Sequence, residues 1–184
     1  MVSGLVLAGG GGRRLGGVDK ALIEVAGATL LDRALAALAG CDERIVVGPA
    51  RPGVDARFVV EPDPGGGPAP AVVAGAAAAT QPDIVVVLAV DLPLVTAEHV
   101  ELLVAALGPG VDAAAALDHR GKANPLLAAY RAEILPRRAD AGLPAAALLP
   151  PATATVDLGE AGLLNVNTPE DLERAREVCG ETGL

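Results

Sequence analysis

The chain has 184 residues, with 23 acidic and 14 basic side chains, a net charge of −9 and 1% aromatic residues. This length suits one domain, residues 1–184, with a core of its own. The acidic balance, without a long basic stretch, argues against a general affinity for nucleic acid or anionic membranes, and the lack of aromatic rings excludes base stacking on an aromatic platform. An anionic ligand must therefore be bound by a local cluster of positive charge.

The first half of the chain alternates short β-branched runs with Ala- and Leu-rich stretches, as in βαβ units on a mostly parallel sheet. We predict strands at 2–8, 44–48, 57–60 and 83–90, the last buried at the sheet centre because it is almost continuously apolar. We predict helices at 30–39 after an N-cap at Thr29, at 71–80, and at 97–107 after an N-cap at Thr96. Gly40 and Gly108 would end the first and third of these helices, and residues 9–19 and 61–70 are predicted loops.

The second half has weaker patterns. Predicted strands cover 111–117 and 124–130, a helix 132–140, and an irregular Pro-rich region with one helical turn 141–152. The final helix begins at Pro169 after an N-cap at Thr168, and Gly180 would end it. The resulting fold class is α/β, with a mostly parallel central sheet and helices on both faces.

The N-terminal segment lacks the order of charges found in a secretory signal, and no apolar run approaches the roughly 18 residues of a membrane span. Cys41 and Cys179 have neither metal-ligand nor disulfide spacing. We therefore expect a cytoplasmic protein with two spare buried thiols.

The segment LAGGGGRRLGGVDK, residues 7–20, directly follows the first predicted strand. Glycines at such a turn let backbone N–H groups approach phosphate oxygens, and Arg13, Arg14 and Lys20 can add positive charge. Neither the GxGxxG spacing of dinucleotide oxidoreductases nor the GxxxxGK[ST] pattern of P-loops is present. The loop therefore indicates a different nucleotide-binding fold.

Asp91 ends the buried strand in LAVDLP. A carboxylate at the carboxyl end of a central parallel strand lies at the ligand-binding edge of such a sheet, where it can hold Mg²⁺ together with phosphates and water. The alternative is a turn-forming or helix-capping Asp before Leu92 and Pro93.

The chain resembles the nucleotidyltransferase superfamily with a single Rossmann-like domain, and within it the molybdenum cofactor guanylyltransferases. The resemblance spans nearly the whole chain in order, through LAGGGGRRLGGVDK, EPDPGGGP, LAVDLPL, NPLLAAYR and NVNTPEDL. It implies transfer of GMP from GTP to the phosphate of molybdopterin, with Mg²⁺ as cofactor and release of pyrophosphate. It also implies contact with other cofactor-biosynthesis proteins and molybdoenzymes.

The resemblance implies catalytic roles for Arg13, Lys20 and Asp91, with Asp91 as the metal ligand. The nucleotide-binding residues that it implies are Leu7, Ala8, Gly9, Gly10, Arg14, Lys20, Gly48, Asp63 and Asp91. Glu61 competes with Asp63 for the role of the acid in EPDPGGGP. Gly48 stands where the family often has Asn, so only its backbone could serve.

Acceptor binding is assigned to Lys122, Asn124, Asn165 and Asn167, although one of the last two could instead form the turn before the capped helix. The chain has only two Lys and three Asn, and all five fall in or beside these motifs. Arg51, His99 and His119 are interpreted as surface residues.

In the family, LAGG at the start of the glycine loop is typical of enzymes that use guanine nucleotides, whereas LAAG-type sequences are typical of enzymes that use cytosine nucleotides. Two alternatives stay open. One is a cytidylyl- or guanylyltransferase for another small phosphorylated acceptor, and the other is a non-catalytic nucleotide sensor on the same fold.

Overall fold

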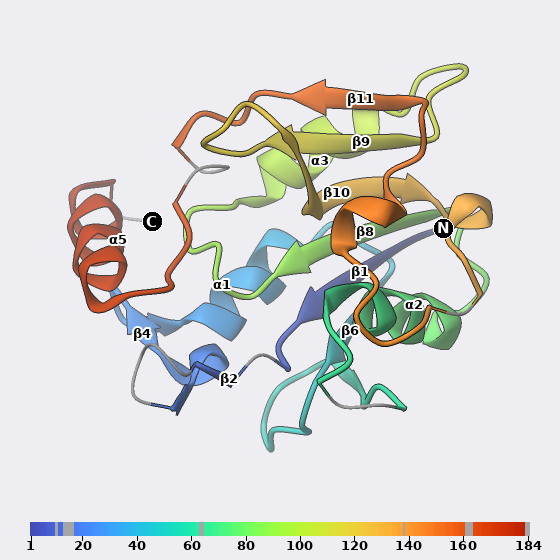
Figure 1. The fold of residues 1–184 in the computed structure, drawn as a ribbon. Helices are drawn as coiled ribbons and strands as arrows, with labels where there is room; N and C mark the ends of the chain where they lie inside the picture. Colours follow the sequence, from blue (N-terminus) through green and yellow to red (C-terminus); the bar gives the residue numbers. More distant parts are fainter. Residues whose placement is uncertain (10, 13–16, 63–64, 138, 161–163, 183–184) are drawn as a thin grey trace.

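The computed structural model describes residues 1–9, 11–12, 17–62, 65–137, 139–160 and 164–182. A seven-stranded sheet in the order β11-β9-β10-β8-β1-β6-β7 forms its centre (Figure 1). Its strands are β1 (Val2–Leu7), β6 (Glu43–Val47), β7 (Arg57–Val59), β8 (Ile84–Ala89), β9 (Ala113–Leu117), β10 (Ala123–Arg131) and β11 (Thr153–Val156). Only β10 runs antiparallel to its neighbours, so the predicted mostly parallel sheet is confirmed, with β8 at its centre.

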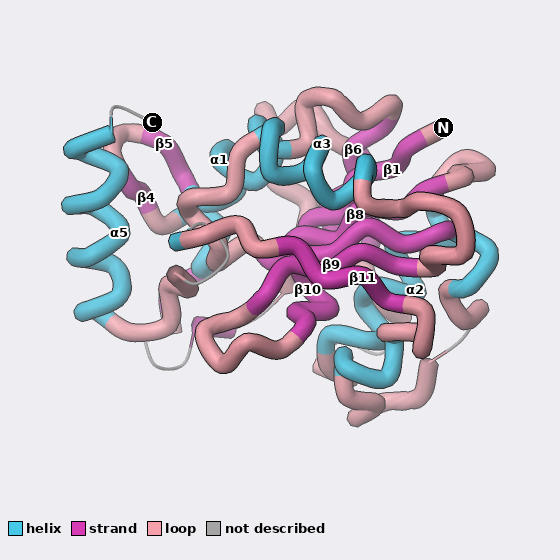
Figure 2. Tube along the Cα trace, turned by 90° about the horizontal axis from the view of Figure 1, so that it is seen from above, coloured by secondary structure: helices cyan, strands magenta, loops and turns pink. Residues whose placement is uncertain are grey.

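Helices cover both faces of the sheet, as predicted. Leu31 of α1 (Leu30–Ala37) and Leu103 of α3 (Ala97–Ala105) share one core with Val6 of β1, whereas Val72 of α2 (Pro68–Ala78) shares the other core with Leu5. Neighbouring strand residues thus point to opposite cores, as the pleat requires. Figure 2 shows α3 and α2 on opposite sides of the sheet.

Several short elements surround the carboxyl ends of the central strands. They are β2 (Gly11–Gly12), β3 (Val18–Asp19), the 3₁₀ turn η2 (Lys20–Leu22), β4 (Glu24–Val25) and β5 (Ala28–Thr29). The last helix, α5 (Pro169–Thr182), lies beside β4 at the side of the sheet (Figure 1). The segment that follows β1 and the segment that leads into α5 therefore lie at the same edge of the sheet.

Several local predictions differ from the structure. Helix α2 begins at Pro68 instead of residue 71, because proline is favoured in the first turn of a helix. Of the described residues within 132–140, only Ala132–Ile134 form a helical turn, the 3₁₀ turn η3, since Pro136 lacks a donor and disfavours a helical residue before it. Strand β11 was not predicted. Helix α5 continues past Gly180, because one glycine costs a helix only about 1 kcal/mol.

The predicted N-caps and the predicted turn within 141–152 are confirmed. Thr29 precedes α1 and accepts a hydrogen bond from the Asp32 backbone N–H at 3.0 Å, and Thr96 precedes α3. The 3₁₀ turn η4 (Ala145–Leu148) supplies the helical turn. Among the described residues, no helix is long and apolar enough to cross a membrane.

Candidate functional site

The carboxyl ends of β1 and β8 lie side by side and bring the glycine loop next to Asp91. Leu7 pairs with Ala89 in the parallel register, and the Val90 N–H donates to the Leu7 carbonyl at 3.2 Å. Gly9 and Asp91 therefore leave the sheet at the same edge, which is where ligands bind in parallel α/β sheets.

Lys20 joins Asp91 to the NVNTPEDL segment. Its ammonium group donates to Asp91 Oδ2 at 3.1 Å and to Asn167 Oδ1 at 2.6 Å. Lys20 and Asp91 are 16% and 23% exposed, so the pair is shielded but open to a ligand. The fold thus brings together three predicted site residues from three distant parts of the chain.

Asn167 is held by the first turn of α5. The Asp171 carboxylate accepts hydrogen bonds from the Asn167 and Thr168 backbone N–H groups at 3.0 and 2.8 Å. Burial raises the pKa of Asp171. The net shift is nevertheless below the usual value, because the two backbone hydrogen bonds, the hydrogen bond with the Thr168 side chain and the charge of Lys20 all lower the pKa. Val166 adds a second tie, because its N–H donates to the Asp91 carbonyl at 2.9 Å. The amide of Asn167 is therefore fixed relative to Asp91.

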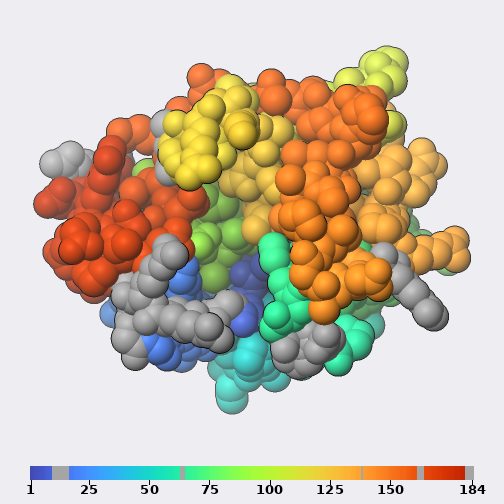
Figure 3. Space-filling view, viewed as in Figure 1, coloured from blue at the N-terminus to red at the C-terminus, as the bar shows by residue number. Residues whose placement is uncertain are grey.

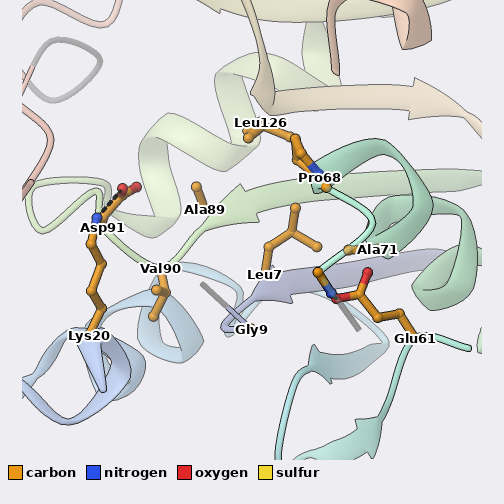
Figure 4. Close-up of a pocket in the computed structure, with 12 residues that line it drawn as sticks. Leu7, Gly9, Lys20, Glu61, Pro68, Ala71, Ala89, Val90, Asp91 and Leu126 are labelled. Atoms are coloured by element: carbon orange, nitrogen blue, oxygen red, sulfur yellow. Dashed lines mark hydrogen bonds and ion pairs between the residues drawn. The ribbon is translucent and has the colours of Figure 1, made fainter. Parts of the chain in front are cut away.

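A pocket of about 350 Å³ opens at this edge. It is lined by Leu7, Gly9, Lys20, Glu61, Gly65, Gly67, Pro68, Ala71, Ala89, Val90, Asp91 and Leu126. Figure 4 shows Lys20 and Asp91 at one end and Glu61 at the other, with Leu7 and Val90 between them. In Figure 3 the dark blue end of β1 lies deep between the red C-terminal helix and the green segment that leads into α2. The pocket is thus charged at both ends and apolar in the middle.

Glu61 is the acid of EPDPGGGP that the structure places in the pocket. Its Oε1 accepts a hydrogen bond from the Gly65 N–H at 3.3 Å, while its Oε2 is buried and has no partner among the described residues. A buried acceptor without a partner is costly, so this oxygen is suited to a donor from a ligand. The competing candidate, Asp63, lies outside the described residues.

Gly48 is buried beside the glycine loop and is absent from the residues that line the pocket. Its φ is +153°, and a Cβ there would lie 2.9 Å from the carbonyl carbon and oxygen of Ala8. Ala8 is itself buried, and its N–H donates to the Val47 carbonyl at 2.9 Å. Gly48 therefore lets β6 approach the start of the loop.

We expect Gly48→Ala to lower the free energy of unfolding by about 1–3 kcal/mol, because the added methyl group would push against the Ala8 backbone. Urea unfolding measures this change. The matched control is Gly40→Ala, since a Cβ at Gly40 has no atom within 4 Å and its φ is not positive. Equal stability of the two variants would contradict the role of Gly48 in the close approach to the Ala8 backbone.

The other predicted residues that the structure describes do not line the pocket. Lys122 is exposed in the turn between β9 and β10, and Asn124 uses its side-chain oxygen to accept the Leu126 N–H at 3.0 Å. Asn165 is half-buried and bonds to no other described side chain. Gly10, Arg13 and Arg14 lie outside the described residues. Of the β10 segment, Leu126 lines the pocket instead.

The interpretation of Arg51 as a solvated surface residue was wrong. Its side chain is 9% exposed and forms an ion pair with Asp19 at 2.7 Å. Arginine is mostly exposed in proteins, and the sequence contains no pattern that links two residues 32 positions apart, so sequence reasoning could not find this pair.

The two histidines and the two cysteines do not line this pocket. His99 accepts the Thr96 N–H at the start of α3, and His119 is exposed and lines a separate pocket of about 230 Å³. Burial raises the pKa of the half-buried Cys41 thiol to about 11, and Cys179 is buried. Neither thiol has the properties of a nucleophile.

The residues at Asp91 fit a magnesium ion whose shell is completed by phosphates. The Asp91 and Asn167 oxygens already converge on one positive charge, the Lys20 ammonium group. Mg²⁺ uses one or two carboxylates plus substrate oxygens and water, and it does not need a protein cage. No cluster of three or more His, Cys, Asp or Glu suited to a metal occurs in the described part of the chain.

Comparisons with known proteins identify the family and the fold of the chain. Residues 4–148 match the model of the MobA-like NTP transferase domain family. A probable molybdenum cofactor guanylyltransferase from Chloroflexus aggregans is 34% identical, with 100% of this chain and 98% of that protein covered. A crystal structure of molybdopterin-guanine dinucleotide biosynthesis protein A from Archaeoglobus fulgidus has a TM-score of 0.72 at 25% identity, covering 97% and 99% of the two chains. The fold also recurs, at a TM-score of 0.68, 20% identity and 96% and 97% coverage, in a Mycobacterium tuberculosis protein solved in complex with manganese.

Proposed function

The chain belongs to the MobA-like NTP transferase family and is a nucleotidyltransferase, and we propose that it transfers GMP from GTP to the phosphate of molybdopterin. The observation that carries this proposal is the convergence of Lys20, Asp91 and Asn167 at one end of a pocket whose opposite end carries Glu61. A triphosphate fits the charged end with Lys20, and a base fits the end with Glu61. The names of similar guanylyltransferases support the same substrates.

The reaction requires little covalent chemistry from the protein. A phosphate oxygen of molybdopterin attacks the α-phosphorus of GTP, and the bond between this phosphorus and the oxygen that bridges to the β-phosphorus breaks. Pyrophosphate leaves with the electron pair of that bond. A phosphate monoester is already an anion near pH 7, so no strong general base is needed, and positioning with charge neutralisation supplies most of the catalysis.

Lys20 supplies a positive charge at the point where the phosphate oxygens must gather. Asp91 would hold Mg²⁺, which when bound neutralises charge on the phosphate oxygens. Asn167 offers an uncharged oxygen beside them, fixed by the first turn of α5. Arg13 and Arg14, which stand in the same motif, remain proposed nucleotide ligands together with Gly10.

Glu61 supports GTP over CTP. Guanine presents two adjacent donors, N1–H and the N2 amino group, which match the two oxygens of a carboxylate, whereas cytosine presents one donor beside an acceptor. The Glu61 carboxylate has one buried oxygen without a partner at the far end of the pocket from Lys20. The Leu7-Ala8-Gly9-Gly10 sequence points to the same base.

We expect Glu61→Gln to lower the ratio of kcat/KM for GTP to that for CTP by about tenfold or more, because an amide has one donor and one acceptor and matches cytosine better. Steady-state kinetics with each nucleotide measure the ratio. Glu43→Gln is the control. Glu43 is the first residue of β6 and does not line the pocket, and it accepts hydrogen bonds from Ser3 and Thr80. An unchanged ratio for Glu61→Gln would show that another residue selects the base.

The remaining assignments are part of the same proposal. Asn165 and Asn167 would contact the acceptor phosphate, and Lys122 and Asn124 would contact the pterin from the β9–β10 turn. We propose that residues 1–184 act as one cytoplasmic domain, and that other cofactor-biosynthesis proteins and molybdoenzymes are its partners.

Pyrophosphate release tests the function against both alternatives. We expect release only when GTP, molybdopterin and Mg²⁺ are all present. A nucleotide sensor would bind GTP and release none. Release with a different phosphorylated acceptor, and none with molybdopterin, would favour the transferase for another acceptor.

A further inference from the structure

Arg51 connects the two ends of the glycine loop. One terminal nitrogen, Nη2, donates to both carboxylate oxygens of Asp19 at 3.0 and 2.7 Å and to the Ala8 carbonyl at 3.3 Å. The other, Nη1, donates to the Pro49 carbonyl at 3.0 Å, which fixes the side chain to the segment after β6. Ala8 precedes the loop and Asp19 ends it, so a single guanidinium group ties its entry to its exit.

Asp19 in turn holds the turn that carries Lys20. Its Oδ1 accepts the Ala21 N–H at 3.1 Å and caps the 3₁₀ turn η2, whose first residue is Lys20. The direction of the Lys20 side chain therefore depends on Asp19, and the position of Asp19 depends on Arg51. The Arg51 side chain is 9% exposed, whereas that of Asp19 is 38% exposed, so the arginine is the buried anchor of the pair.

We propose that Arg51 is a positioning residue that acts through Asp19 to set Lys20 in the phosphate-binding part of the pocket. The inference rests on the proposed function, because it assigns Lys20 to the nucleotide phosphates. Arg51 itself is absent from the residues that line the pocket, so its effect on the phosphate site is indirect. Lysine cannot replace it, since only the planar guanidinium group presents several fixed donors to a carboxylate and a carbonyl at once.

The test compares the dissociation constants of GTP and guanosine in Arg51→Lys. We expect GTP to bind about tenfold more weakly while guanosine binds as in the unaltered protein, because only the phosphates contact Lys20. A purely structural role would weaken both ligands. Arg44→Ala is the control, since Arg44 pairs with the fully exposed Asp55 and lines no part of this pocket.

A double-mutant cycle completes the test. When Lys20 is already Ala, we expect Arg51→Lys to cause no further loss of GTP affinity, because Arg51 acts only through Lys20. Additive losses, or equal weakening of GTP and guanosine, would overturn the proposal. If Arg51→Lys fails to fold by circular dichroism, Asp19→Asn gives the same comparison, since it keeps an oxygen for the Ala21 N–H but weakens the link to Arg51.

The two proposals can fail separately. A protein that binds GTP no better than guanosine, or no better than CTP, would contradict the proposed function before any variant is made. A normal preference for GTP with no selective effect of Arg51→Lys would contradict only the role of Arg51.

Discussion

Lys20→Ala is expected to lower kcat for GMP transfer by about a thousandfold, because the variant loses the positive charge that faces the reacting phosphates. The loss should fall mainly on kcat, since a charge that stabilises the transition state contributes less to binding of the ground state. Single-turnover measurements with saturating GTP separate the chemical step from product release.

The fold should survive this substitution. Lys20 belongs to neither hydrophobic core, so its truncation leaves the packing of both faces of the sheet intact. Arg176→Ala serves as a matched control, because it removes an exposed cation of α5 that pairs with Glu173 and is expected to keep full activity. A near-normal kcat for Lys20→Ala would contradict the catalytic role of Lys20.

Asp91→Asn is expected to abolish most of the transfer activity, again by about a thousandfold, because the amide keeps the shape of the carboxylate but loses the charge that would hold Mg²⁺. The second readout is the concentration of Mg²⁺ that gives half-maximal activity, which should rise sharply in the variant. Equilibrium binding of Mn²⁺ in the presence of GTP measures the same loss without turnover.

Asp83→Asn is the control for Asp91→Asn. Asp83 and Asp91 flank the same strand, β8, at its opposite ends, and Asp83 pairs with the N-terminal ammonium group far from the pocket. Substituting Asp83 should leave the Mg²⁺ requirement unchanged. An unchanged requirement in Asp91→Asn as well would show that the metal is held elsewhere.

The parts of the site that follow a strand could be predicted from sequence. The apolar run before Asp91 is typical of a central strand, and the glycines after Leu7 indicate a loop at the same edge, so their proximity follows from the parallel sheet. The capped start of α5 was equally readable from Thr168 and Pro169. Local patterns of this kind need no knowledge of tertiary contacts.

The tertiary pairs could not be predicted in the same way. Lys20 and Asn167 are 147 positions apart, and Arg51 and Asp19 are 32 apart, so only packing reveals that they meet. The unpartnered oxygen of Glu61 is likewise a property of its surroundings and not of the EPDPGGGP sequence. The helix predicted at 132–140 is wrong for a local reason, because Pro136 lacks a donor and disfavours a helical residue before it.

The most direct measurement is a competition between the two nucleotides in one reaction. The purified protein receives molybdopterin, Mg²⁺ and equal concentrations of GTP and CTP, and mass spectrometry identifies the nucleotide joined to the pterin phosphate. We expect a product that carries GMP, with one pyrophosphate released for each molecule formed. A product that carries CMP, or GTP consumption without any nucleotide on molybdopterin, would contradict it.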